Sequence, residues 1–365
     1  MNGPTLVWYS DPHVDDVGPL SRLDNWSLTV LGKISQVGTI AAEVEASAIL
    51  CGGDFCHTKT PSRTTHRLVG MVSRLHRLFP CPTLCNVGNH DCRHSNYEFL
   101  PESPLGSLFS SGVLIPCYDD HEATFEKDGV FVRVVGIPYH GPRYDRERFR
   151  SIRKGEEDHL VVMAHLLASP QGGSMFEGED ILSYAELAEL CPDATVLAFG
   201  HWHKDQGVVE NIPGRQWIVN VGSLTRGSIS EDDLSRTPCA VVLRFGQGSF
   251  SFERRDIVVA PSSKVFDLSK RRQEEVREKQ ISAFAESLRS QFLTSSGAKK
   301  SIVDLVEDSS LLSDKPDLAR KVKCRARTFL EQALCNDGRS TSPLTKHTSP
   351  APSSTSGPKG GRGST

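Results

Sequence analysis

The chain has no long hydrophobic run. None of its 365 residues belongs to a stretch of about 18 consecutive apolar residues, which a membrane-spanning helix requires. The opening residues MNGPTLVW also lack the basic and apolar regions of a secretory signal peptide. We therefore expect a cytoplasmic protein that does not bind a membrane.

A strong charge of either sign is missing as well. The 42 basic residues nearly balance the 45 acidic ones, which leaves a net charge of −3, and 38% of the residues are hydrophobic. This composition is typical of a soluble globular protein without a general attraction to nucleic acid. A bound polyanion would have to meet a local basic patch.

Ten cysteines are present, but they lack the spacing of a zinc ribbon. Cys81, Cys85 and Cys92 follow the pattern C-x3-C-x6-C, and a metal site there is the alternative to reduced thiols. Most of the cysteines lie inside apolar runs. Buried, reduced thiols in a reducing compartment are therefore the favoured interpretation.

Apolar strand-like runs alternate with helical patterns from about residue 6 to residue 258, which indicates an α/β domain over 1–258. The runs CAVVLRF and SFSFERR flank the turn GQG and predict a hairpin. After Pro261 the residue pattern becomes that of charged amphipathic helices, so 259–335 is predicted to be a small helical region. Residues 336–365 are rich in Ser, Thr, Pro and Gly, and we expect a disordered tail.

Polar side chains follow several of the predicted strands. The run LVWY ends before Asp11, Pro12 and His13, and Pro12 has no backbone N–H, so the strand must stop there. Taken alone, this first case is better explained by an Asp-Pro turn. The same pattern recurs after other apolar runs at Asp54 and His57, at Asn89 and His90, at His165, and at His201 and His203.

Most of these side chains are of the types that bind metal ions. Singly, a histidine after a strand is more often a loop residue with its own hydrogen bonds. Two carboxylates, one amide and four imidazoles together suffice for two divalent cations with one bridging carboxylate. The mixed nitrogen and oxygen donors favour manganese, iron or zinc over magnesium. Two such cations outweigh two carboxylates, which leaves positive charge for a phosphate ester.

The ordered motifs D-x-H, G-D-x-x-H, G-N-H-D, a single His and G-H-x-H resemble the calcineurin-like metallophosphoesterase superfamily over residues 6–205, and to about 258 with the following strands. The resemblance implies a four-layer αββα sandwich of two mixed β-sheets flanked by helices. It also implies a role for each matched residue. Asp11, His13 and His203 would hold the first metal, Asn89, His165 and His201 the second, Asp54 would bridge them, and His90 would donate a proton to the leaving oxygen.

Within the superfamily, GDFCHTKTPS and GNHD resemble the SbcD and Mre-eleven nuclease subunits of DNA repair complexes. This likeness implies a manganese-dependent exonuclease and endonuclease acting on DNA in repair or recombination. There, His57 would help to place the substrate or His90. It also implies that helices in 259–335 bind an SbcC-type coiled-coil ATPase, and that the chain forms a homodimer.

Other interpretations stay open. The second, capping domain with which nuclease relatives grip duplex DNA is short or missing after residue 258, which leaves room for a phosphoesterase acting on small phosphodiesters or phosphomonoesters. A non-catalytic scaffold that binds partners is a rival from another class. The basic run YDRERFRSIRK at 144–154 could contact phosphates, or it could be a solvated helix face.

Overall fold

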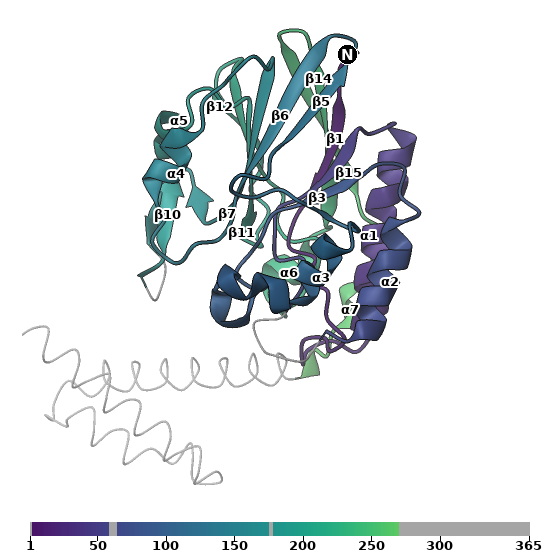
Figure 1. Ribbon diagram of the computed structural model, residues 1–365. Coiled ribbons are helices and arrows are strands. Elements are labelled where there is room, and N and C mark those ends of the chain that lie inside the picture. The colour runs from purple at the N-terminus through teal and green to yellow at the C-terminus, as the bar shows by residue number, and fades with distance from the viewer. Residues whose placement is uncertain (1, 58–63, 175–177, 270–365) are drawn as a thin grey trace, which may run out of the picture. The chain divides into compact units, whose positions relative to one another are not determined.

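The structure is a computed structural model that describes residues 2–57, 64–174 and 178–269. These residues lie in one compact unit spanning residues 1–271. Two six-stranded sheets form its centre, and helices lie on their outer faces (Figure 1). The helices expected after Pro261 from residue 270 onward, the tail and the segment 58–63 lie outside the described residues.

The first sheet has the order β15-β14-β1-β2-β3-β4. Strands β1 to β4 run parallel, and the β14–β15 hairpin joins β1 in antiparallel fashion. The bounds are Thr5–Tyr9 (β1), Ala48–Cys51 (β2), Thr83–Cys85 (β3), Ile115–Pro116 (β4), Cys239–Gly246 (β14) and Ser249–Asp256 (β15).

The second sheet has the order β12-β13-β11-β7-β6-β5. Its four central strands are parallel, whereas the edge strands β12 and β5 are antiparallel to their neighbours. The bounds are Ala123–Lys127 (β5), Val130–Ile137 (β6), His159–Leu166 (β7), Val196–His201 (β11), Gly207–Ile212 (β12) and Gln216–Asn220 (β13). A small third sheet consists of Ala168–Ser169 (β8), Gly173–Ser174 (β9) and Asp180–Ser183 (β10).

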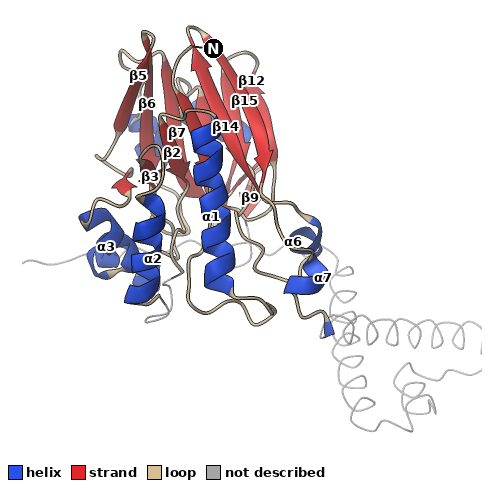
Figure 2. Ribbon diagram, turned by 90° about the vertical axis from the view of Figure 1, so that its right-hand side faces the viewer, coloured by secondary structure: helices blue, strands red, loops and turns tan. Residues whose placement is uncertain are grey.

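Helices cover both outer faces. Figure 2 shows α1 and α2 along the first sheet, and Figure 1 shows α4 and α5 beside the second. The α-helices are Trp26–Glu43 (α1), His66–His76 (α2), Pro104–Ser110 (α3), Arg146–Ser151 (α4), Tyr184–Leu190 (α5), Glu231–Ser235 (α6) and Ser262–Val265 (α7). The 3₁₀ helices are Arg93–Ser95 (η1) and Tyr97–Glu102 (η2).

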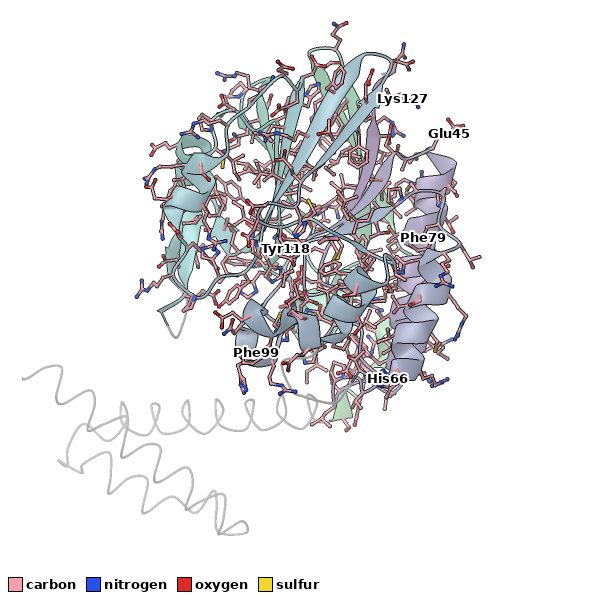
Figure 3. All side chains as sticks on the ribbon, viewed as in Figure 1. Glu45, His66, Phe79, Phe99, Tyr118 and Lys127 are labelled. Carbon is pink, nitrogen blue, oxygen red and sulfur yellow. The ribbon has the colours of Figure 1, made fainter. Side chains whose placement is uncertain are left out.

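The hydrophobic core forms three layers. Side chains alternate along β1, so Leu6 and Trp8 pack between the two sheets, whereas Val7 packs beneath α1. A third cluster joins the outer face of the second sheet to α4 and α5. Phe79, which follows α2, occupies the space that a side chain at Gly38 of α1 would need (Figure 3). The expected four-layer αββα sandwich of two mixed sheets is therefore confirmed.

The strands predicted from apolar runs are confirmed, and so is the hairpin at the turn GQG. The sequence did not reveal the edge strands β5 and β12, since their half-exposed sequences ATFEK and GVVENI contain no apolar run. No helix within the described residues is both long enough and apolar enough to cross a bilayer.

Candidate metal centre

Loops from both sheets meet at one end of the sandwich. The parallel strands β1, β2 and β3 end there, and so do β7 and β11 of the second sheet. The loops and strand ends bring together Asp11, His13, Asp54, Asn89, His90, His165, His201 and His203. Because carboxyl ends of parallel strands share one edge, side chains far apart in sequence become neighbours.

The first cluster of donor atoms contains Asp11, His13, Asp54 and His203, whose potential ligand atoms lie within 4.8 Å of one another. Nε2 of His13 lies 2.9 Å from Nε2 of His203 and 3.9 Å from Oδ2 of Asp54. Both aspartates are completely buried, whereas the His203 side chain is half exposed. Nitrogen and oxygen lone pairs that converge in this way suit a divalent cation.

The second cluster contains Asp54, His165 and His201, again within 4.8 Å. Nε2 of His165 lies 3.4 Å from Oδ2 of Asp54 and 3.3 Å from Oδ1 of Asn89. Oδ1 of Asp54 accepts the backbone N–H of His90 at 2.7 Å. Its buried Oδ2 has no well-directed hydrogen bond within the described residues. Asp54 therefore belongs to both clusters, with one oxygen fixed and the other turned toward the imidazoles.

Hydrogen bonds orient the two imidazoles of the second cluster. Nδ1 of His165 donates to the carbonyl of Gly52 at 2.9 Å, which leaves Nε2 for a cation. Nε2 of His201 donates to Glu179 at 2.9 Å, which leaves Nδ1. Glu179 also accepts the Tyr144 hydroxyl at 2.9 Å. Sequence reasoning missed Glu179, since it lies in no motif and no apolar run leads to it.

The backbone at the donor residues is unusual. Nine non-glycine residues among those described have positive φ, and four of them belong to the clusters: Asp11 (53°), His13 (49°), Asp54 (49°) and His201 (86°). Left-handed backbone is costly for residues with a side chain and persists only where the surroundings impose it. Strain of this kind concentrates at functional sites, which agrees with a functional role for these loops.

His90 and His57 lie beside the first cluster. The ring of His90 stacks on that of His57 at a centroid distance of 4.6 Å and meets the ring of His13 edge-on at 5.0 Å. Both side chains are partly exposed and line the adjoining cavity. The predicted proton donor and the predicted substrate-placing residue are thus neighbours that face open space.

Asp91 connects two of the loops. Its buried carboxylate accepts the backbone N–H of Cys56 at 2.7 Å and that of Gly88 at 2.8 Å. A side chain at Gly88 would be impossible, because its Cβ would lie 2.1 Å from Oδ1 of Asp54. Asp91 thereby fixes the loop after β2 against the loop after β3.

The charges of the site shift the pKa values of its members. Burial alone would lower the pKa of His165, but the negative charges of Asp54 and Asp11 outweigh it and raise the pKa to about 10. For the acid Glu179, burial alone would raise the pKa. The hydrogen bonds from His201 and Tyr144 nevertheless hold this pKa below its usual range. The negative charges of Asp54 and Asp11 therefore favour positive charge at His165, as expected beside a cation site, whereas burial and the neighbouring imidazoles lower the pKa of His13.

A cavity of about 720 Å³ opens beside the donor clusters. Trp26, Leu167 and Trp202 provide apolar wall, and Lys204 lines the cavity as well. The acidic side chains on its wall are Asp15, Glu179, Asp232 and Asp233. A phosphate ester with an attached organic group of moderate size fits this volume.

The basic run at 144–154 is largely paired within the protein. Arg146 binds Asp180 and Glu186, and Arg148 binds Asp119 at 2.6 Å. Arg150 pairs with Glu147 of the same helix. These pairs favour the solvated helix face over a phosphate-binding surface.

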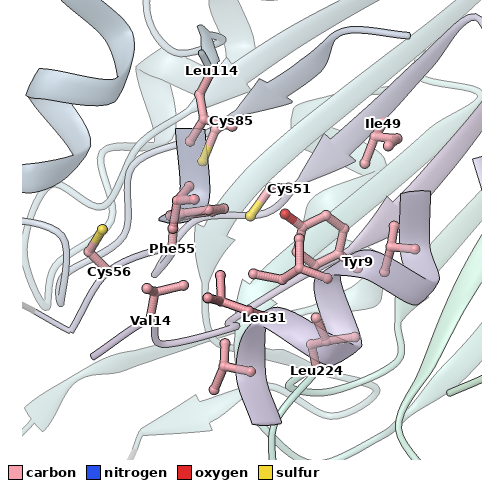
Figure 4. Packing of buried hydrophobic residues seen from close by; sticks show 14 of the residues in the cluster. Tyr9, Val14, Leu31, Ile49, Cys51, Phe55, Cys56, Cys85, Leu114 and Leu224 are labelled. Atoms are coloured by element: carbon pink, nitrogen blue, oxygen red, sulfur yellow. The ribbon is translucent and has the colours of Figure 1, made fainter. Parts of the chain in front are cut away.

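The described cysteines are free, and most are buried. Cys51, Cys56 and Cys85 pack with Phe55 in the core beneath the site loops (Figure 4). Burial raises the thiol pKa of Cys56 and Cys85. Among the described residues no potential metal-binding group includes a cysteine, so the alternative of a site at Cys81, Cys85 and Cys92 finds no support.

Comparison with known proteins identifies one matching family. The model for calcineurin-like phosphoesterases matches residues 4–205, which is more than half of the chain. None of the curated protein sequences matches the chain significantly.

Solved structures with a similar fold are distant in sequence. A dimetal phosphatase from Danio rerio is 10% identical with a TM-score of 0.45, over 71% of this chain and 98% of that protein. The calcineurin-like phosphoesterase YfkN from Bacillus subtilis is 12% identical with a TM-score of 0.43, over 72% and 94%. An NAD nucleotidase from Haemophilus influenzae is 10% identical with a TM-score of 0.43, over 69% of this chain but only 49% of its own length.

Proposed function

The chain belongs to the calcineurin-like phosphoesterases, a metal-dependent family, and from this premise we propose that it is a manganese-dependent DNA nuclease. It acts as an exonuclease on duplex ends and as an endonuclease on single strands, in DNA repair or recombination. The observation that carries this proposal is the pair His57 and His90, because the histidine of G-D-x-x-H is the feature that resembles the SbcD and Mre-eleven nucleases.

Two cations fit the donor set. Asp11, His13 and His203 would hold the first, Asn89, His165 and His201 would hold the second, and Asp54 would contribute to both. Such cations would supply a nucleophile at neutral pH and stabilise the charge that develops on the phosphate. The mixed nitrogen and oxygen donors suit Mn²⁺.

A side chain of the protein donates the proton to the leaving group. The backbone N–H of His90 is tied to Asp54, and its ring is stacked on His57, so the imidazole has a defined position at the cavity wall. From there His90 protonates the leaving oxygen of the ester. His57 restrains the His90 ring and lies with its Nδ1 3.4 Å from Nδ1 of His13.

The experiment is digestion of two DNA substrates in Mn²⁺, end-labelled linear duplex and circular single-stranded DNA, by the full chain and its His90→Ala form. Release of labelled nucleotides and opening of circles by the wild type, with loss of both in the variant, is the expected result. A wild type that leaves both substrates intact under conditions where it hydrolyses a simple diester contradicts the nuclease assignment.

A second candidate is a phosphoesterase acting on small phosphodiesters or phosphomonoesters. The cavity volume of about 720 Å³ favours it, because a phosphate ester with an organic group of moderate size fits there. The arginines of α4 are paired with acids of the protein, which also favours this candidate over a nucleic-acid-binding enzyme. Hydrolysis of bis-p-nitrophenyl phosphate without any action on DNA in Mn²⁺ would select this candidate.

The partner assignments extend the nuclease proposal. Residues 259–335 bind an SbcC-type coiled-coil ATPase, and the chain forms a homodimer. Pull-down of such an ATPase by the full chain, but not by residues 1–271, is expected, since 1–271 forms one compact unit. Equal capture by both would contradict the ATPase assignment, and a monomeric mass in solution would contradict the dimer.

A further inference from the structure

A second, smaller cavity lies near the large one. In the segment Thr225–Gly227, Thr225 and Gly227 line the large cavity, whereas Arg226 lines another cavity of about 220 Å³. Arg22 and Lys33 also line the smaller cavity. Leu28 and Val258, both strongly exposed, belong to its lining as well, so the cavity communicates with solvent.

The three cationic side chains of this cavity are buried. Lys33 lies on the core face of α1 with 3% exposure, and its Nζ donates one hydrogen bond, to the carbonyl of Leu224 at 3.0 Å. Arg226 is 4% exposed and donates to the carbonyl of Ala260 and the hydroxyl of Ser262. Its buried Nε has no partner within the described residues.

Arg22 completes the group. Its guanidinium forms a two-point ion pair with Asp24 at 2.7 and 2.8 Å and donates to the carbonyl of Arg226 at 2.8 Å. Arg22 and Arg226 also both lie near the ring of Phe266, at 4.8 and 5.9 Å from its centroid. These contacts fix the two guanidinium groups at the cavity wall.

The charges of the cavity do not balance. Asp24 is the one carboxylate among its lining residues, against three cations. Arg236, which lies nearby, is already paired with Asp232 and Asp233. Buried charge without a counterion is costly, and the pKa of Lys33 falls to about 7 because of burial and the charges of Arg226 and Arg22. An anion in the cavity would relieve this cost.

We propose that this cavity is a binding site for a tetrahedral phosphate group, separate from the metal centre. Lys33 supplies two further N–H donors and Arg226 supplies the charge of its guanidinium, and a charge-assisted hydrogen bond to phosphate is among the stronger ones. The phosphate group comes either from inorganic phosphate or from the end of a phosphoester. The site does not depend on the nuclease assignment.

The test is isothermal titration calorimetry on the full chain after treatment with a chelator, so that phosphate cannot bind through metal ions. Inorganic phosphate and methyl phosphate are titrated at constant ionic strength. One phosphate per chain is expected for the wild type. Lys33→Met and Arg226→Gln should each raise the dissociation constant about tenfold or more, the effect of losing one charge-assisted hydrogen bond.

The matched control is Lys127→Met, since Lys127 is exposed at the β5–β6 turn (Figure 3) and should bind as the wild type does. Binding of both ligands identifies a terminal phosphate group, and binding of inorganic phosphate alone identifies the free ion. Absence of saturable binding to the wild type overturns the proposal. So does unchanged affinity in folded Lys33→Met, and if Arg226→Gln does not fold, Lys33→Met decides alone.

Discussion

The two buried charge clusters of this protein lack opposite kinds of partner, although residues of the segment Thr225–Gly227 line both of the cavities beside them. In the metal centre, oxygen and nitrogen lone pairs converge without enough donors, as at Oδ2 of Asp54. In the smaller cavity, N–H donors converge without enough acceptors, as at Nε of Arg226. Each arrangement is expensive without the ligand of opposite charge, so the comparison indicates a cation for one and an anion for the other.

The largest effect should come from the residue shared by both metal positions. Asp54→Ala removes the one carboxylate that belongs to both clusters, and we expect both metal ions and all activity to be lost. Metal analysis after reconstitution measures this directly. The control is Glu126→Ala, an exposed acid on β5 that should keep two ions. Retention of both ions by Asp54→Ala would contradict the idea that the metal centre depends on Asp54 for cation binding.

His90→Ala tests whether the donor clusters and the proton donor are separable. The variant should keep both metal ions and lose roughly 10²–10⁴ in turnover, the usual contribution of a general acid. Steady-state kinetics and metal content are measured together, with the exposed His121→Ala as the control. Loss of the metals as well would make His90 a ligand or a structural support instead.

Glu179→Gln tests whether the Glu179 carboxylate orients His201 in the second cluster. Its carboxylate accepts from Nε2 of His201, and loss of such a partner commonly weakens metal affinity about 10–100-fold. Competition with a fluorescent chelator gives the affinity. Glu186→Gln, which alters an acid paired with Arg146 on the outer surface, should leave the metal affinity unchanged.

The effect that is smallest per unit of the variable changed concerns the smaller, cationic cavity. The folded-state pKa of Lys33 is about 7, well below its usual 10.5, so the unfolded chain binds one more proton between these values. Stability should therefore rise with pH in this window, by about 1.4 kcal/mol per pH unit, relative to Lys33→Met. Urea unfolding of the chelator-treated proteins without phosphate measures the difference. Parallel stability curves for the two proteins would show that Lys33 keeps its proton.

The sandwich and the convergence of the predicted metal ligands could both be predicted from the sequence, because apolar runs end in short polar motifs whose order is distinctive. Residues that lie outside a recognisable motif could not be predicted from the sequence. Glu179 meets His201 only through the path of the chain before β10. Lys33 looks like any charged residue of a helix until α1 packs on the first sheet and buries it. Pairing of the arginines in α4 also depends on distant acids.

The left-handed backbone at Asp11, His13, Asp54 and His201 has a consequence for the kinetics of metal uptake. Loops held in this shape by the surrounding contacts would need no ordering step when an ion arrives, so we expect capture to be limited by diffusion and by release of water from the ion. Pro12, held between two such residues, removes further freedom from the first of these loops. An exchanged or lost ion could therefore be replaced rapidly, without any refolding of the protein.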